Sequence, residues 1–532
     1  MTSQWAPLRR PLFRSLWMAQ LGSNLGSWMQ SVGAQWYLVE QTHSPALVAW
    51  VQTASLLPVV LLSLVAGVLA DAWDRRRLLI ATTALSAIAA AVLMLLDIVG
   101  GLAPWSLLLI TFTLGCLAAL TNPAWQAIQP ELVPREEIPA AASLGSVTVN
   151  GARAIGPAIA GAIVGLAGSW PVFALNAVSF LGVLVVLARW KRPARITQLG
   201  RERFGPAMAA GVRYMRAAPG ARRILLRAAL FALPASALWA LLPTVAVVDL
   251  HLAAAGYGLL LGALGIGSVL GVFVLPLLRR HLSTSWLLAG SALVFAAGTA
   301  APALRSSALV IPVFVLSGVA WIATLTVLNA GLQLTLAEWV RARGMAVYLL
   351  VFLGGQGLAS FIWGLTAEFL GAATTLLIAA ALLVLTAASV PWLPLTAQVG
   401  TLDRTITMLG AGEPELVFDP DPTDGPVTIS IDYLIRPDHE PRFVAAMRRV
   451  ELSRRRTGAT SWQLDRSGDT ERTYREEFTV RSWGEFRRSA RERWTGYDHS
   501  NLDEALTHVV SEPVEQHYFP TMPKPRGLHQ NH

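Results

Sequence analysis

The chain has 532 residues, of which 54% are hydrophobic and only 14% are charged, and its formal net charge is +9. An ordinary soluble domain carries roughly 25% charged residues, so the composition excludes a wholly soluble globular protein. The single cysteine, Cys116, excludes an intrachain disulfide and a thiolate metal cluster.

The charge distribution divides the chain near residue 400. Residues 1–400 contain 24 Lys and Arg and 11 Asp and Glu, whereas residues 401–532 contain 18 and 22. This asymmetry predicts a membrane body followed by a charged tail. The basic excess belongs to the membrane body, where basic residues set orientation, so we expect no nucleic-acid partner.

Twelve apolar stretches are long enough to cross a bilayer, whose ~30 Å core needs about 20 helical residues. They lie near residues 13–39, 46–70, 78–99, 104–128, 140–166, 169–190, 223–248, 256–279, 284–303, 307–336, 344–369 and 372–396. The sequence therefore predicts an all-α membrane protein with twelve transmembrane helices in two pseudo-symmetric six-helix halves. We expect the boundaries 1–190 for the N-terminal bundle, 191–222 for a cytoplasmic central linker, 223–400 for the C-terminal bundle, 401–426 for a second linker, 427–520 for a cytoplasmic domain and 521–532 for a tail.

The basic residues predict the orientation. With the N-terminus inside, 22 of the 24 basic residues in 1–400 fall at the inner surface, Arg305 lies outside and Arg153 lies in mid-membrane. We therefore expect a multi-pass protein of the inner (plasma) membrane with both termini in the cytoplasm.

A faint internal repeat supports two related halves. Glycines recur at 151/354, 161/364 and 168/371, a constant offset of 203 residues that equates the fifth and eleventh spans. Two six-helix halves related by an axis along the membrane normal are a known transporter plan. The same offset pairs Arg153 with Gln356.

The loop after the second span, GVLADAWDRRR (67–77), resembles the loop signature of the major facilitator superfamily, although Ala72 and Asp74 depart from it. The matching positions are Gly67, Asp71, Arg75 and Arg76. Gly67 lets two helices approach closely, and a carboxylate here can meet a helix N-terminus or pair with the arginines. The alternative is a helix end with ordinary positive-inside charge.

Gly156, Pro157 and Gly161 resemble the fifth-span motif of exporters and antiporters in this superfamily, with plain close packing as the alternative. Phrases such as LGSNLGSWMQSVGAQWYLVEQTHSP and PELVPREEIPAAASL are similar to the transmembrane secretion effector branch, whose best-known members export siderophores such as enterobactin. The resemblance implies a major facilitator fold, alternating access and export of small amphipathic molecules, siderophore-like or drug-like, in exchange for protons.

The resemblance also implies a central cavity lined by spans 1, 4, 7 and 10, where polar residues should gather because unpaired polar groups are costly in hydrocarbon. In the first span, Gln20, Asn24, Ser27 and Ser31 share one helix face, with Trp28 beside it. The other candidate binding residues are Asn122, Trp125, Trp239, Trp321, Thr324, Asn329 and Gln356. For each polar residue, interhelical hydrogen bonding is an equal alternative, and for Trp125 and Trp239 core or interface packing is the favoured interpretation.

Arg153 is a permanent cation in the middle of the fifth span. An arginine there costs at least ~2.5 kcal/mol on insertion scales and usually faces a cavity or a partner. One interpretation is that it binds an anionic or catechol-like group of the cargo or takes part in coupling. The other is that it bonds backbone carbonyls or snorkels.

The residues alone do not identify the energy source for transport. No Asp or Glu lies near a span midpoint, so proton coupling is implied by the resemblance alone, with Asp71 and Glu368 as candidates. No Walker-type GxxxxGK[ST] motif supports ATP hydrolysis. We expect no cofactor, no metal and no catalytic residue.

The tail predicts a strand over 427–435, a helix, a hairpin and further helices. This order suggests a ferredoxin-like α+β domain and resembles the small, commonly dimeric domains of antibiotic-biosynthesis monooxygenases. We expect this domain to be a regulatory, dimerising or cargo-sensing module, with catalysis as the alternative, and a homodimer would form through it. For the whole chain, the alternatives to an exporter are a lysolipid or lipid flippase and a membrane-tethered sensor or enzyme.

Overall fold

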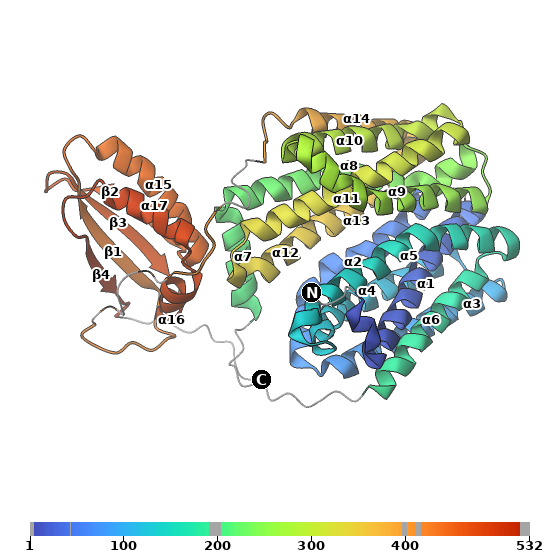
Figure 1. The fold of residues 1–532 in the computed structure, drawn as a ribbon, viewed down its shortest axis with the longest axis horizontal. Coiled ribbons are helices and arrows are strands. Elements are labelled where there is room, and N and C mark those ends of the chain that lie inside the picture. The colour runs from blue at the N-terminus through green and yellow to red at the C-terminus, as the bar shows by residue number, and fades with distance from the viewer. Residues whose placement is uncertain are drawn as a thin grey trace. The chain divides into compact units, whose positions relative to one another are not determined.

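The structure is a computed structural model that describes residues 5–42, 44–190, 204–395, 402–407, 409, 414 and 416–521. Long helices dominate it, and a four-stranded sheet lies in the C-terminal part of the chain (Figure 1). The chain separates into two compact units. Unit 1 contains Met1–Leu199, Leu225–Asn329 and Tyr348–Pro394, and unit 2 contains Gly200–Ile224, Ala330–Val347 and Leu395–His532.

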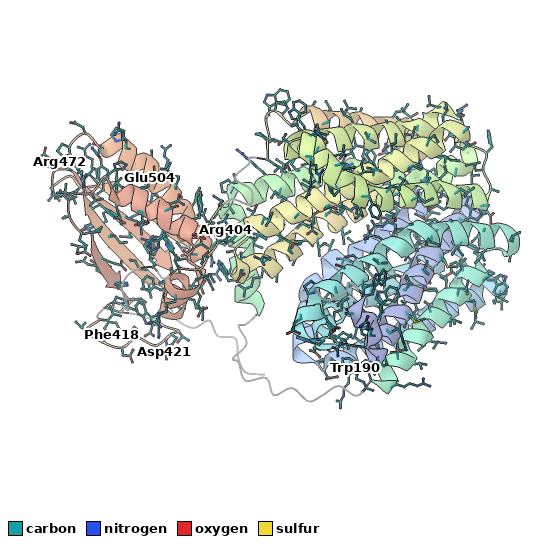
Figure 2. The ribbon with its side chains drawn as sticks, viewed as in Figure 1. Trp190, Arg404, Phe418, Asp421, Arg472 and Glu504 are labelled. Atoms are coloured by element: carbon teal, nitrogen blue, oxygen red, sulfur yellow. The ribbon has the colours of Figure 1, made fainter. Side chains whose placement is uncertain are left out.

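Six long helices form the first half of unit 1. They are α1 (Pro11–Thr42), α2 (Pro45–Ala72), α3 (Arg75–Ile98), α4 (Pro104–Ile128), α5 (Ile138–Ala167) and α6 (Trp170–Arg189), with short 3-10 turns at Ala6–Arg9, Gln129–Glu131 and Arg135–Glu137. Proline opens α1, α2 and α4, where its missing N–H would have no helical acceptor. Trp190 follows α6 and is buried with Leu16 and Leu79 (Figure 2).

The second half is built from α8 (Pro219–Val248), α9 (Ala254–His281), α10 (Thr284–Ala300), α11 (Ser307–Thr335), α13 (Gly355–Leu370) and α14 (Ala372–Ala388). The intervening helix α12 (Glu338–Leu349) falls almost wholly within the segment Ala330–Val347 of unit 2. A 3-10 turn at Ala301–Leu304 follows α10, and a π turn at Leu350–Gly354 joins α12 to α13. The first eleven predicted spans therefore coincide with helix to within a few residues, and the eleventh is divided between α12 and α13. The twelfth, predicted over 372–396, is helical over Ala372–Ala388.

Ten of the described helical segments are long and apolar enough to cross a membrane. The 17-residue α14 is shorter. The 32-residue α1 falls outside the ten because its amide and hydroxyl side chains lower its mean hydropathy. The expectation of a multi-pass membrane protein is confirmed.

The two halves of unit 1 meet through glycines. A Cβ added at Gly161 of α5 would lie 2.6 Å from the carbonyl oxygen of Ala254 in α9. On the other side, a Cβ added at Gly364 of α13 would lie 2.6 Å from the Cβ of Ala49 in α2. The absence of a side chain is what permits both approaches.

The faint sequence repeat has a structural counterpart at the ends of two helices. Gly168 ends α5 with φ +77°, and Gly371, its partner at the offset of 203, ends α13 with φ +80°. Positive φ favours glycine because it lacks a Cβ. The repeated glycines thus terminate equivalent helices in the two halves.

Unit 2 contains α7 (Phe204–Ala217) and the C-terminal elements β1 (Val427–Leu434), α15 (Glu440–Thr457), β2 (Ser461–Arg466), β3 (Thr473–Val480), α16 (Trp483–Arg488), α17 (Gly496–Leu506) and β4 (Val514–Tyr518), with a π turn at Ser489–Arg493. The strands form an antiparallel sheet in the order β2-β3-β1-β4. The predicted C-terminal sheet is confirmed.

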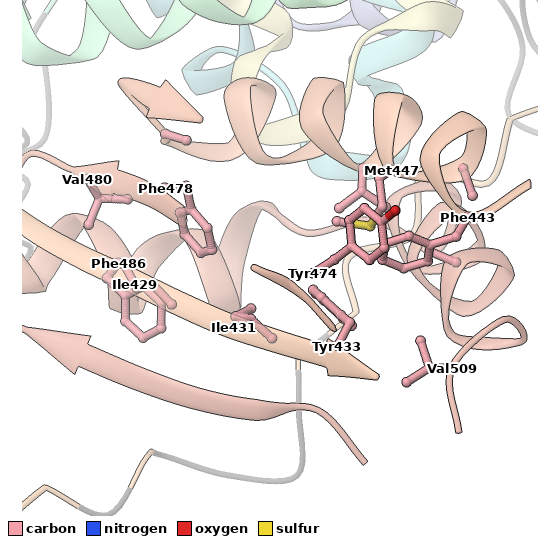
Figure 3. Packing of buried hydrophobic residues seen from close by; sticks show 14 of the residues in the cluster. Ile429, Ile431, Tyr433, Phe443, Met447, Tyr474, Phe478, Val480, Phe486 and Val509 are labelled. Carbon is pink, nitrogen blue, oxygen red and sulfur yellow. The ribbon is translucent and has the colours of Figure 1, made fainter. Parts of the chain in front are cut away.

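The core of the C-terminal elements lies between the sheet and α15. Ile429, Ile431 and Tyr433 of β1 are buried in one cluster with Phe443 and Met447 of α15 (Figure 3). Their spacing follows the period of two that places alternate strand residues on one face. The tail sequence therefore folds around an apolar core of its own.

Candidate functional site

The polar face of α1 lines a cavity of about 240 Å³ inside the first half of unit 1. We call it the polar chamber. Its described lining comes from α1, α2, α3, α4 and α6. The polar lining residues are Gln20, Ser23, Asn24, Ser27, Gln30, Ser31, Ser55, Thr83, Ser86, Thr111, Thr121, Asn122 and Asn176. The chamber therefore brings together the four predicted polar residues of the first span, Gln20, Asn24, Ser27 and Ser31, with Asn122 and Trp125 of the fourth.

Fixed hydrogen bonds hold part of this lining. The Asn176 amide donates to Gln30 Oε1 at 2.5 Å, and the hydroxyl of Thr121 donates to Thr82 Oγ1 at 2.9 Å. Two other groups, Asn24 Nδ2 and Thr111 Oγ1, are buried without a protein partner. The chamber therefore has both a rigid polar frame and unsatisfied hydrogen-bonding groups.

A second cavity, of about 190 Å³, lies between the halves of unit 1, and we call it the interhalf cavity. Trp28 and Gln52 line it from α1 and α2, and Trp239 and Tyr257 line it from α8 and α9. Ser27, Ser31 and Ser55 line both cavities, which therefore adjoin. Both halves thus contribute side chains to one space, as a carrier site requires.

Gln35 links the halves at one end of the interhalf cavity. Its Oε1 accepts a hydrogen bond from the hydroxyl of Tyr257 at 2.6 Å, and its Nε2 donates to the carbonyl of Trp239 at 3.5 Å. The rings of Trp36 and Tyr257 stack with centroids 6.0 Å apart. These contacts join α1 to α8 and α9.

Aromatic rings continue from the interhalf cavity into the second half. Trp28 lies 6.4 Å from Trp239, Trp239 lies 5.4 Å from Trp321, and Trp321 lies 5.9 Å from Phe352. The indole N–H groups of Trp239 and Trp321 are buried without a partner. The rings provide an apolar surface with a few unused donors, which suits an aromatic or amphipathic molecule.

Arg153 of α5 lies over the ring of Trp28 of α1. Its guanidinium carbon is 5.6 Å from the Trp28 ring centroid, a cation–π distance. Its Nε is buried without a hydrogen-bond partner, and Arg153 lines neither the polar chamber nor the interhalf cavity in the described part of the chain. Contact with cargo at Arg153 therefore remains a prediction.

Besides Arg153 and Trp321, three predicted binding residues line neither cavity. Thr324 is buried and its hydroxyl donates to the carbonyl of Ala320 on the same helix at 3.0 Å. Gln356 is buried with Nε2 unpartnered, and Asn329 has a polar partner. None of the three lines either cavity.

The loop signature is built into the first half. Asp74 caps α3 by accepting from the backbone N–H of Arg77 at 2.9 Å, and Arg75 pairs with Glu131 at 3.0 Å. Arg76 donates to the last carbonyls of α6, at 2.9 and 2.8 Å. Gly67 and Asp71 belong to the last turns of α2, and their surroundings lie outside the described residues.

The fifth-span motif lies at two helix contacts. A Cβ added at Gly156 would lie 2.9 Å from the Cβ of Trp28 in α1. The carbonyl oxygen of Pro157 lies against Gly258 of α9, which Gly161 also meets. The motif therefore lies where α5 packs against both halves, and its gating role remains a prediction.

The carboxylates of unit 1 lie near helix ends. Glu368 of α13 accepts from the Ser44 hydroxyl at 2.8 Å and from the backbone N–H of Ala46 at 3.3 Å, and so ties the start of α2 to the other half. Asp249 lies 3.7 Å from Arg305. Neither carboxylate lines the polar chamber or the interhalf cavity.

No group of three or more His, Cys, Asp or Glu side chains that could hold a metal occurs among the described residues. His439 and His508 face each other with Nδ1 atoms 3.0 Å apart, and Arg404 lies over the ring of Tyr497 at 5.4 Å (Figure 2). Buried Glu476 is saturated by Tyr433, Arg454 and Trp462. These contacts stabilise the fold.

Sequence reasoning missed Gln30, Gln35, Asn176 and Tyr257. Gln35 continues the predicted polar stripe one turn beyond Ser31, whereas Gln30 lies on α1 off that stripe, and Tyr257 and Asn176 are single polar groups in apolar helices. A polar side chain isolated in an apolar span was the available signal, because it needs a partner. The identity of each partner depends on the helix packed against it.

Comparison with known proteins gives the family. Residues 2–519 match the transmembrane secretion effector family. The bacterial homolog of the human lysosomal transporter Spinster, solved in an inward-facing and unoccupied conformation, aligns with 72% of this chain and 96% of its own at a TM-score of 0.56 and 16% identity. That likeness shows the fold.

Two curated relatives are transporters. The staphyloferrin A transporter of Staphylococcus aureus is 28% identical over 48% of this chain, and the enterobactin exporter EntS of Citrobacter koseri is 27% identical over 49%. The chain spans 65% and 62% of the lengths of these relatives. The matched family and these relatives are transporters and not enzymes. The chain belongs to the transmembrane secretion effector family of major facilitator transporters.

Proposed function

We propose that the protein is a secondary active transporter that exports small amphipathic molecules, siderophore-like or drug-like, by alternating access in exchange for protons. The observation that carries the proposal is the interhalf cavity, to which α1 and α2 contribute from one half and α8 and α9 from the other. A site built by both halves becomes accessible from either side when the halves rock. The relatives named for siderophores support this cargo class and, in one case, export.

We further propose twelve spans in the inner membrane with cytoplasmic termini, with α1 and α14 added to the ten clearly apolar segments. The positive-inside rule supports this orientation. It places the Ser44–Glu368 and Gln35–Tyr257 bonds at the outer end of the bundle. The contacts that join the halves then correspond to a state closed toward the outside.

For the tail we propose a cytoplasmic ferredoxin-like domain over 427–520 that regulates the carrier or pairs it as a homodimer. The sheet order β2-β3-β1-β4 and the strand–helix–strand–strand–helix–strand sequence support this class. We also propose the bundle and linker boundaries that the sequence predicts.

The test is transport by the full chain in proteoliposomes with an imposed proton gradient. Fluorescent amphipathic drugs and siderophores should move only when the gradient is present, and Trp239→Leu should slow that movement. The control is Trp392→Leu, at a tryptophan that is 78% exposed, and this substitution should leave the rate of movement unchanged. Movement of a labelled lysolipid but of no drug or siderophore would instead favour a flippase.

A further inference from the structure

The polar chamber carries no charge. Of its described lining residues, thirteen have amide or hydroxyl side chains, and none is Asp, Glu, Lys, Arg or His. Arg153, the one cation in the middle of a span, does not line it. An ionised group entering the chamber would lose its hydration without gaining an opposite charge, which costs several kcal/mol.

The chamber is also not satisfied by the protein alone. Thr111, 7% exposed, lines it with an Oγ1 that has no hydrogen-bond partner, and Asn24 Nδ2 on the facing helix is likewise unpartnered. Burying such groups unpaired is unfavourable. An occupant that offers hydroxyl or amide groups would satisfy both.

The volume of the polar chamber limits the size of the group that can occupy it. A cavity of about 240 Å³ holds several waters, since ~10–15 Å³ of such volume already accommodates one, and it has room for one sugar-sized ring. The chamber adjoins the interhalf cavity through Ser27 and Ser31, and that cavity presents Trp28 and Trp239. A molecule occupying both would have a neutral hydrophilic end and an aromatic or apolar body.

We propose that the polar chamber is a subsite for a neutral, hydroxyl- or amide-bearing group about the size of a sugar ring, while the apolar part of the same molecule lies against Trp28 and Trp239. This rests on the proposed transport function and gives its substrate class. The uncharged lining selects against a carboxylate at the hydrophilic end.

A matched ligand pair tests the proposal on the full chain in lipid nanodiscs. The probes are 4-methylumbelliferyl β-D-glucoside, the corresponding β-D-glucuronide, whose sugar carries a carboxylate, and 4-methylumbelliferone without a sugar. The glucoside should bind at least tenfold more tightly than the glucuronide at pH 7. Equal affinity for the two, or no binding of the glucoside, overturns the proposal.

Variants locate the effect. Thr111→Val should weaken glucoside binding about tenfold and leave 4-methylumbelliferone unchanged, because it removes only the hydroxyl. Thr113→Val is the control, since that exposed hydroxyl lies on the same helix, bonds to the carbonyl of Leu109 and does not line the chamber. The proposal is overturned if Thr111→Val binds the glucoside as tightly as the parent protein does, or if it loses affinity for all three probes equally. Intact binding without proton-driven movement counts against the transport function instead.

Discussion

Substitution of Gly161 by alanine tests the contact between α5 and α9. The new Cβ would lie 2.6 Å from the carbonyl oxygen of Ala254 and 2.7 Å from the Cα of Gly258. Both contacts are with backbone atoms of α9, which cannot turn aside as a flexible side chain can, so relief requires the two helices to separate by nearly 1 Å. Overpacking of this kind costs about 1–3 kcal/mol, which corresponds to roughly a 5- to 150-fold shift away from the state in which the helices touch.

The shift is measurable as a distance. Spin labels at Val99 and Leu304, exposed by 73% and 64%, report the separation of the halves in a Cys116→Ala background. Gly161→Ala should enrich the longer-distance population and slow transport. Gly165→Ala, one turn further along α5, is the control, because its Cβ would meet α9 at an ordinary 3.7 Å.

The reasoning fails if the two alanine variants give the same distance distribution as the parent protein. It also fails if Gly165→Ala opens the halves as strongly as Gly161→Ala, because the effect would then come from helix stiffening rather than from the contact with α9.

Three further predictions follow from single contacts. Tyr257→Phe leaves Gln35 Oε1 without its donor and should destabilise the protein by about 1–2 kcal/mol in thermal unfolding. Arg76→Leu removes the bonds to the last carbonyls of α6 and should cost a similar amount by the same measurement. Burial raises the pKa of Glu485, but the hydrogen bond and charge of Arg493, together with the neighbouring Arg488 and Arg213, outweigh burial and hold that pKa below its usual range. Ionised Glu485 therefore adds to the free energy of unfolding above pH about 4.5, and this contribution is lost as the pH falls below that value. Glu485→Gln should remove this pH dependence, measured by fluorescence-monitored unfolding of the C-terminal elements.

The helices of unit 1 could be predicted from the sequence because each depends on a local property. A long apolar run has to be helical in lipid, since no water is available to the backbone. Proline marks the start of α2 and α4, and Gly168 marks the end of α5, for conformational reasons that act within a few residues. The same locality made the polar face of α1 predictable, because a helical period alone places its residues together.

The partners of those faces were decided by the tertiary structure. Thr111 and Asn176 reach the polar chamber only because α4 and α6 pack around α1, and the bond from Tyr257 to Gln35 joins residues 222 positions apart. From the sequence, Arg153 could either face a cavity or make a contact between helices. The packing of α5 on α1 decides this, because it places the guanidinium over the ring of Trp28. Helical period determines which side chains share a stripe, whereas the neighbour that covers a stripe depends on the summed packing of distant helices.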